Sequence, residues 1–125
     1  MKKIKSVKEA FELENLDPNA ITIEGVPERH KEALIAMAHL FVVVDAVNPT
    51  YQPDFTDGQW NKYVPWFKMG SPSGVGFSYL GYDGWGASSY VGARLVSESR
   101  EATDYIAETF PELYKAIMVY ERKVK

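Results

Sequence analysis

Residues 63–95 read YVPWFKMGSPSGVGFSYLGYDGWGASSYVGARL, and this segment decides the fold. It is rich in aromatic and small residues and almost free of charge. Short aromatic and β-branched runs separated by glycine-rich clusters are typical of strands joined by turns. The same rings are typical of a stacking or binding face if they lie outside the core. The segment therefore has two interpretations, a sheet with its core or an exposed recognition surface.

The pattern predicts an antiparallel meander of three strands, which are Tyr63–Met69, Val75–Leu80 and Tyr90–Ser97. Gly70–Gly74 has turn chemistry, and we expect Gly81–Ser89 to form a second loop. Pro65 favours an edge position or a bulge because proline cannot donate to the ladder. A sheet of three strands buries one face against one layer of helices. Many of the rings are therefore expected in the core, and some at the rim or on the far face.

Two helices are predicted before this segment. Ser6 and Glu9 have the spacing of a capping box at the start of Val7–Asn15. Pro27 then begins an amphipathic helix that runs to about Val47. Its second half is apolar on more than one side at Leu40–Val44, so we expect the sheet and another helix, or a partner subunit in a homodimer, to enclose it.

A last helical region follows the sheet, with Ser99 as its N-cap. The apolar stripe keeps its phase across Pro111, although proline in a helix interior costs about 3 kcal/mol. We therefore expect a kink or a break at Thr109–Pro111. The predicted fold is a single α+β domain over residues 1–125: two N-terminal helices, a three-stranded antiparallel meander and a C-terminal helix.

Composition limits the classes of function. The chain has 125 residues, a net charge of −3 and no cysteine, which excludes disulfides, thiolate metal sites and cysteine nucleophiles. Its apolar runs, such as Leu40–Val44, are too short to span a bilayer, and the start of the chain has no signal-peptide pattern. We expect a soluble protein of the host cytoplasm or of a virus particle, with no cofactor and no membrane partner.

The order of features also resembles a known group of proteins. PERHKEALIAMAHLFVVVDAVNPTYQPDF, KYVPWFKM, GFSY and SSYVGARLVSESREATDYIAETFPELYKAIM follow one another over about Pro27–Met118. In this order they resemble small proteins that gut Bacteroidetes, their phages and mobile elements encode. The resemblance implies a phage or mobile-element setting and a shared fold, and it transfers no catalytic residue.

The aromatic set supplies the main candidate site. Its members lie in or beside the predicted loops and strand ends, with an arginine that we expect on the same sheet face as Tyr90: Trp66, Tyr82, Asp83, Trp85, Tyr90 and Arg94. An arginine beside aromatic rings can stack, hold a phosphate or pair with a carboxylate. The competing interpretation is that Trp60 and Trp66 anchor the core and that Arg94 packs over a tyrosine or pairs with an acid. We expect a non-enzymatic protein that binds an unidentified protein partner.

Two alternative functions belong to other classes. A metal-dependent hydrolase or nuclease would draw on four acids, Asp54, Asp57, Asp83 and Glu98. A single-stranded nucleic-acid binder would use the rings for stacking, although a net charge of −3 and basic residues that cluster near the two chain ends do not favour it. His30 and His39 lie about 180° apart on one helix, so they cannot share a metal. We expect no metal site from them.

Overall fold

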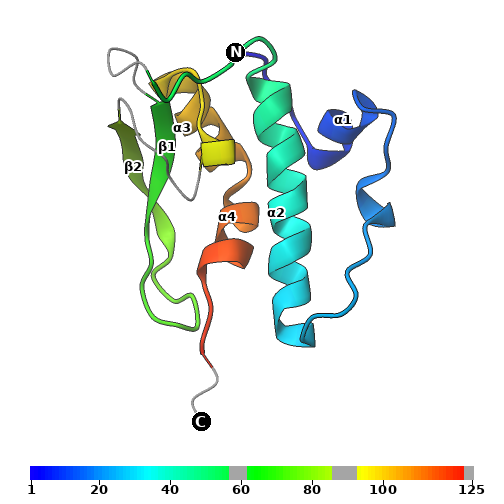
Figure 1. Cartoon of the computed structure of the whole chain (residues 1–125). Coiled ribbons are helices and arrows are strands. Elements are labelled where there is room, and N and C mark those ends of the chain that lie inside the picture. Colours follow the sequence, from blue (N-terminus) through cyan, green and yellow to red (C-terminus); the bar gives the residue numbers. More distant parts are fainter. Residues whose placement is uncertain (57–61, 86–92, 123–125) are drawn as a thin grey trace.

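A computed structural model of the chain describes residues 1–56, 62–85 and 93–122, and for residues 83–85 it describes the backbone alone. Four α-helices, two short 3₁₀ helices and two strands make up the described part (Figure 1). In chain order they are α1 (Val7–Glu12), η1 (Pro18–Ala20), α2 (Glu28–Val47), β1 (Lys62–Lys68), β2 (Ser78–Trp85), η2 (Ala93–Leu95), α3 (Arg100–Thr109) and α4 (Pro111–Met118). The α+β class that the sequence predicts is confirmed.

The elements stack in an order that differs from their order in the chain. The β1–β2 hairpin lies on one side of α3 and α4, α2 packs along α4, and α1 covers the outer side of α2 (Figure 1). One cluster of buried apolar side chains joins the layers, and it includes Ala10, Leu40, Phe67, Ile106 and Tyr114. The core therefore runs through the helical layers, and the hairpin contributes only one of its faces to it.

The first helix begins where its cap predicts and ends early. The Ser6 hydroxyl accepts a hydrogen bond from the Glu9 amide at 3.0 Å, while the Glu9 carboxylate accepts one from the Lys5 amide at 2.8 Å. The helix stops at Glu12 and not at Asn15. Asn15 adopts a φ of 57°, in the left-handed region that helices do not continue through.

The long helix α2 is enclosed within the chain itself. Leu40, Val43 and Val44 are buried, with α1 on one side of the helix and α4 on the other. Two helices therefore surround the Leu40–Val44 segment, and its apolar character needs no partner subunit as an explanation. No helix in the described ranges combines the length and apolar character that a membrane crossing requires.

Pro111 splits the C-terminal helical region into α3 and α4, as its position predicts. Phe110, between the two helices, has a φ of −124° and a ψ of 45°, which is not helical. Pro111 then occupies the first turn of α4, where its missing N–H is harmless. At the start of α3 the Ser99 hydroxyl accepts from the Ala102 amide at 3.1 Å, so the predicted cap is confirmed.

The sheet departs from the prediction in two respects. The first predicted strand is confirmed as β1, but the second begins at Ser78 and continues through Gly81–Trp85, which the sequence predicted as loop. Positive φ angles at Gly70, Gly74 and Gly76 extend the turn and delay the start of β2. Pro65 was expected at an edge or at a bulge, and it pairs in register with Tyr82. The register shifts between Trp66 and Phe67, and the extra residue of this bulge is Leu80 on the opposite strand.

The predicted third strand is wrong over its described part. Tyr90 lies outside the described residues, and Ala93–Leu95 forms the 3₁₀ helix η2. Among residues 93–97, only Ser97 pairs with the sheet, through two backbone hydrogen bonds with Tyr63 at 2.8 and 3.3 Å. A single bridge cannot align a strand, so the described sheet has two strands.

Candidate functional site

One face of the hairpin packs on the C-terminal helices. The Phe67 ring lies 4.9 Å from the Phe77 ring and 4.9 Å from the Tyr114 ring of α4. The Tyr79 hydroxyl donates to the Asp104 carboxylate of α3. Because side chains alternate along a strand, Tyr63 and Pro65 share this face of β1 with Phe67. These rings are structural, as the core interpretation of the segment predicted.

Two tyrosine hydroxyls on this side interact with α3. Burial raises the pKa of Tyr79, and the hydrogen bond to Asp104 raises it further. At the start of α3, the Arg100 guanidinium donates to the Tyr82 hydroxyl at 3.3 Å and lies 5.6 Å from the Tyr82 ring. This hydrogen bond raises the pKa of the guanidinium. Tyr82 therefore belongs to the helix-facing side, where it joins the hairpin to α3.

The opposite side of the hairpin carries exposed apolar side chains. Trp66 of β1 is 52% exposed and Leu80 of β2 is 64% exposed. Trp66 pairs in register with Gly81, where an added Cβ would meet nothing within 4 Å. Met69 and Val75, in the connecting turn, are 39% and 75% exposed. We call the surface formed by Trp66, Lys68, Ser78 and Leu80 the open hairpin face.

The same side of the hairpin is covered at its other end. Val64 and Lys62 are buried, and the Lys62 ammonium lies 5.5 Å from the ring of Phe55, in the connection after α2. Among the described side chains on this side of the hairpin, the apolar exposure lies in the turn-proximal half. An exposed tryptophan beside an exposed leucine is the type of surface that proteins use for partners.

The structure does not bring the predicted site residues together. Trp66 lies on the open hairpin face, whereas Tyr82 lies on the helix-facing side. Arg94 was expected on a sheet face beside Tyr90, but it belongs to η2, with its guanidinium carbon 5.3 Å from the Phe41 ring of α2. Arg94 therefore packs against a helix, because the chain turns into a 3₁₀ helix where a third strand was expected.

The remaining predicted site residues are only partly described. The backbone of Asp83 and Trp85 belongs to β2, paired with Val64 and Lys62, and not to a loop. Their side chains, and the whole of Tyr90, lie outside the described part of the chain. Their part in a binding site stays a prediction.

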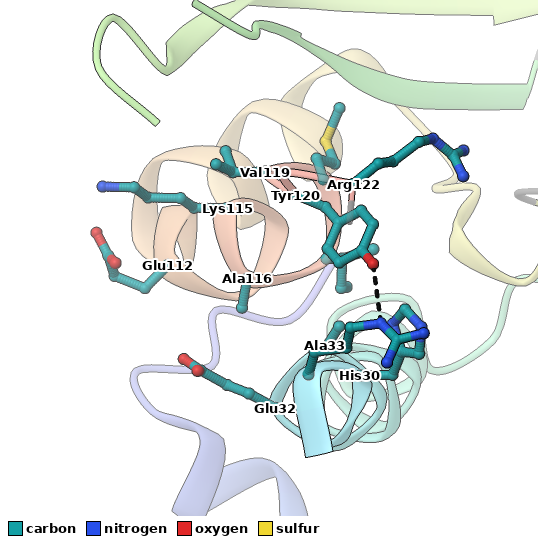
Figure 2. Close-up of a pocket in the computed structure, with 12 residues that line it drawn as sticks. His30, Glu32, Ala33, Glu112, Lys115, Ala116, Val119, Tyr120 and Arg122 are labelled. Carbon is teal, nitrogen blue, oxygen red and sulfur yellow. Dashed lines mark hydrogen bonds between the residues drawn. The ribbon is translucent and has the colours of Figure 1, made fainter. Parts of the chain in front are cut away.

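A cleft of about 730 Å³ lies on another side of the molecule, between the start of α2 and the end of α4 (Figure 2). Charged side chains from both helices surround an apolar floor, and the chain after α4 closes one end. The lining residues that carry charge or a polar ring are Arg29, His30, Glu32, Glu112, Lys115, Tyr120 and Arg122. This volume is within the range of small-molecule sites.

Of the four acids proposed for metal catalysis, the structure describes the side chains of Asp54 and Glu98, and both have other partners. Within residues 1–56, 62–85 and 93–122, no group of three or more metal-ligating side chains is found. The Asp54 carboxylate accepts from the Thr56 amide at 2.8 Å and from its hydroxyl at 2.6 Å, as in a loop cap. The side chains of Asp57 and Asp83 are outside the described residues.

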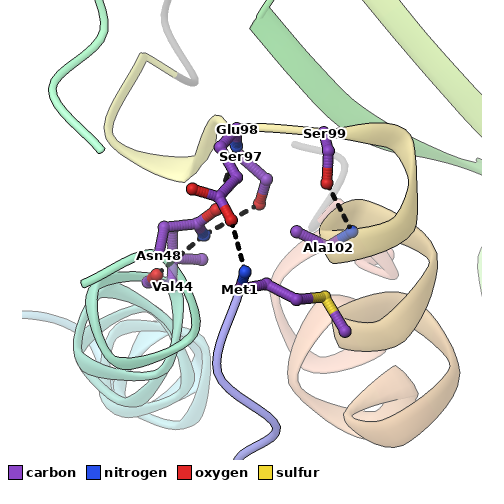
Figure 3. A network of polar contacts seen from close by, with 7 residues as sticks. All are labelled: Met1, Val44, Asn48, Ser97, Glu98, Ser99 and Ala102. Carbon is purple, nitrogen blue, oxygen red and sulfur yellow. Dashed lines mark hydrogen bonds and ion pairs between the residues drawn. The ribbon is translucent and has the colours of Figure 1, made fainter. Parts of the chain in front are cut away.

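Glu98 has a structural environment instead. Its carboxylate lies 2.7 Å from the amino group of Met1, and its amide donates to the side-chain oxygen of Asn48 at 2.9 Å (Figure 3). The buried Asn48 amide group also donates to the Val44 carbonyl and to the Ser97 hydroxyl, at 2.9 and 3.1 Å. All of the polar atoms of the Asn48 side chain are bonded, so this network joins the end of α2 to the segment before α3.

Both histidines contact other segments of the chain. His39 shares a hydrogen bond of 2.9 Å with the Pro18 carbonyl and meets the Phe11 ring edge to face. His30 lies 5.3 Å from the Tyr120 ring in the cleft. The two histidines lie at separate positions on α2 and contact different segments, in agreement with their spacing in the sequence.

Comparison with known proteins identifies no relative. The chain matches no protein-family model, no curated protein and no solved structure. The resemblance to proteins of gut Bacteroidetes and their phages therefore stays a prediction, and a function has to be argued from the two surfaces described above.

The sequence reasoning missed the cleft entirely. No role was assigned to Arg29 or Arg122 from the sequence. The small side chains of Ala33 and Ala116 are the sequence feature that indicates this cleft, because they leave room where the two helices approach each other. Helix pairing is a tertiary property, so the periodicity of either helix alone does not predict it.

Proposed function

We propose that this protein is a non-enzymatic interaction protein that binds a protein partner through the open hairpin face. The observation that carries the proposal is the pair Trp66 and Leu80, both more than half exposed, on a sheet face where Lys62 and Val64 of β1 are buried. Tryptophan is the residue most enriched among interface residues that dominate binding energy. Met69 and Val75 extend the apolar surface along the turn.

The chemistry of the face favours a protein over a nucleic acid. Lys68 is the one cation among the four residues of the open hairpin face, and the chain has a net charge of −3. Nucleic-acid binding draws most of its affinity from many phosphate contacts, which this face does not offer. Leucine has no planar surface on which a base could stack, but it fits an apolar pocket of a partner.

Partner capture by matched variants tests this function. The resemblance noted in the sequence suggests lysates of gut Bacteroidetes, with and without phage, as the source of partners. Tagged wild-type protein should enrich one specific protein, and Trp66→Ala and Leu80→Ser should each reduce its recovery at least about tenfold, which corresponds to 1.4 kcal/mol. Because both side chains are exposed, the melting temperature should change by no more than about 2 °C.

Leu16→Ser is the matched control. Leu16 is 61% exposed, close to the value of Leu80, but it lies in the connection between α1 and η1, away from the hairpin. This variant should capture the partner as wild type does. Equal recovery with Leu80→Ser and Leu16→Ser would contradict the proposal, as would a captured species that is a salt-sensitive single-stranded oligonucleotide.

A further inference from the structure

The α2–α4 cleft has an apolar floor between walls of opposite charge. Ala33 of α2 and Ala116 of α4 face each other across it, with Ile117 and Val119 beside them. Alanines at these positions leave volume that larger side chains would fill. The floor can therefore accept a small apolar group, and the packed helices that form it make the cleft largely preformed.

One end of the cleft is cationic. Figure 2 shows Tyr120, Arg122 and His30 on one side and Glu32, Glu112 and Lys115 on the other. The Arg29 Nε donates to the Tyr120 hydroxyl at 3.2 Å, which fixes the guanidinium beside the Tyr120 ring. The two terminal nitrogens of a guanidinium held in this way keep their donors for a ligand.

These cations are not neutralised within the described residues. The ion pairs of the described chain join Met1 to Glu98, Lys8 to Glu12 and Lys31 to Glu28, and none includes Arg29, Lys115 or Arg122. The positive end of the α2 dipole adds to the potential here, while the C-terminal end of α4 opposes it. The side chains therefore decide the sign of the charge that the cleft attracts.

We propose that this cleft binds a small aromatic anion, a ring that carries a carboxylate or a phosphate. The ring lies over the alanine floor beside Tyr120, whose own ring already stands 5.3 Å from His30. The anionic group meets Arg29 and Arg122, where the guanidinium fork suits both carboxylate and phosphate. This site is separate from the open hairpin face and does not depend on the proposed protein partner.

Four probe compounds distinguish the contribution of the aromatic ring to binding from that of the negative charge. Each compound is titrated into the protein while the amide NMR shifts are recorded. Benzoate and phenyl phosphate combine both features, inorganic phosphate has only the charge, and benzylamine has the ring with the opposite charge. We expect saturable shifts in 29–33 and 115–122 with the first two probes, with an affinity at least about tenfold above that of phosphate. Benzylamine should cause no saturable shift there.

Substitutions in the cleft then test whether phenyl phosphate binds there. Arg29→Gln and Arg122→Gln should each weaken phenyl phosphate binding about tenfold, and Ala116→Leu should block the ring by filling the floor. Arg100→Gln removes an exposed arginine at the far end of α3 and should leave the affinity unchanged. If Ala116→Leu disturbs folding, the two arginine variants still decide the result.

The assignment would be overturned if neither aromatic anion caused a saturable shift up to 10 mM, which is roughly the weakest affinity of interest. It would also be overturned if benzylamine bound as tightly as phenyl phosphate, or if both arginine variants kept the wild-type affinity for phenyl phosphate. Trp66→Ala should bind phenyl phosphate normally. Loss of partner capture with normal anion binding would thus separate the failure of one surface from the failure of the other.

Discussion

At the scale of single residues, Thr103 stands out in α3 because it is buried with its hydroxyl unbonded. Within the described chain, the Thr103 Oγ1 is the buried side-chain polar atom without a hydrogen-bond partner. Thr103→Val keeps the shape and the branched Cβ and removes the unpaired oxygen. We expect the free energy of unfolding in urea to rise by up to about 1 kcal/mol.

Thr103→Ala is the control for this substitution, because it removes the hydroxyl and a packed methyl group together. It should be less stable than Thr103→Val. A loss of more than about 1 kcal/mol in Thr103→Val would mean that the hydroxyl has a partner, for instance an internal water.

Two tyrosines make stability depend on alkaline pH. Burial raises the pKa of Tyr114 and, with the hydrogen bond to Asp104, the pKa of Tyr79. The folded state therefore holds both protons more tightly than the unfolded state, whose tyrosines titrate near about pH 10. The stabilisation that these two tyrosines give the folded state is therefore complete below that pH and is lost above it. The free energy of unfolding should fall as pH rises beyond about 10.

Urea unfolding at pH 9, 10 and 11 measures this slope (roughly one unit on either side of the ordinary tyrosine pKa). Tyr79→Phe and Tyr114→Phe each remove one titrating group and should make the decline shallower than in wild type. Equal slopes in wild type and both variants would show that other groups cause the alkaline loss.

At the scale of elements, the hairpin depends on one tight turn. Gly70 has a φ of +70°, and a Cβ there would lie 2.0 Å from the Val75 carbonyl oxygen. Gly25 has a φ of +79° but has nothing within 4 Å of an added Cβ. Gly70→Ala and Gly25→Ala each place an alanine in the left-handed backbone conformation, which costs about 1–2 kcal/mol. Of these two substitutions, only Gly70→Ala adds a clash with the backbone.

We therefore expect Gly70→Ala to lower the free energy of unfolding at least twice as much as Gly25→Ala. Amide NMR shifts should change along β1 and β2 in Gly70→Ala and stay local in Gly25→Ala. Equal costs for the two variants would mean that the turn can relax without disturbing the strands.

Elements whose ends are marked by local chemistry were predicted well from the sequence. Ser6, Ser99 and Pro111 mark helix boundaries through their own hydrogen bonds or missing N–H, and all three positions are confirmed. The strand β2 was misplaced because three glycines with positive φ prolong the turn, and a glycine's conformation cannot be read from its identity.

The candidate site was predicted less well than the fold. Trp66 is exposed as the binding interpretation requires, but strand alternation on a misplaced β2 could not show that Tyr82 faces α3. Arg94 was assigned to a sheet face that its 3₁₀ segment does not have. Which face a side chain occupies depends on register, and a shift of one residue reverses it.

At the scale of the whole molecule, the stacked order predicts unequal stability. α1 has six residues and packs mainly on α2, with Ala10 and Phe11 as its buried residues. α2 is covered on two sides. Native-state hydrogen exchange should therefore give a lower opening free energy for α1 than for Leu40–Val44 in the second half of α2.

The measurement is amide exchange at low denaturant concentrations, residue by residue. α1 amides should exchange through local opening with little dependence on denaturant, whereas Leu40–Val44 should exchange through global unfolding. Exchange of both segments with the same free energy and denaturant dependence would show that α1 unfolds together with the rest.

The tip of the hairpin rests on a wall of the cleft. A Cβ added at Gly74 would lie 3.2 Å from Lys115 Cε and 3.2 Å from Val119 Cγ1, so the turn and the end of α4 are in direct contact. An occupant that displaces Lys115 would change a contact of the turn that connects the strands of Trp66 and Leu80. The two surfaces would then be thermodynamically linked, and whatever the anion does to the partner's affinity, the partner must do in equal measure to the anion's.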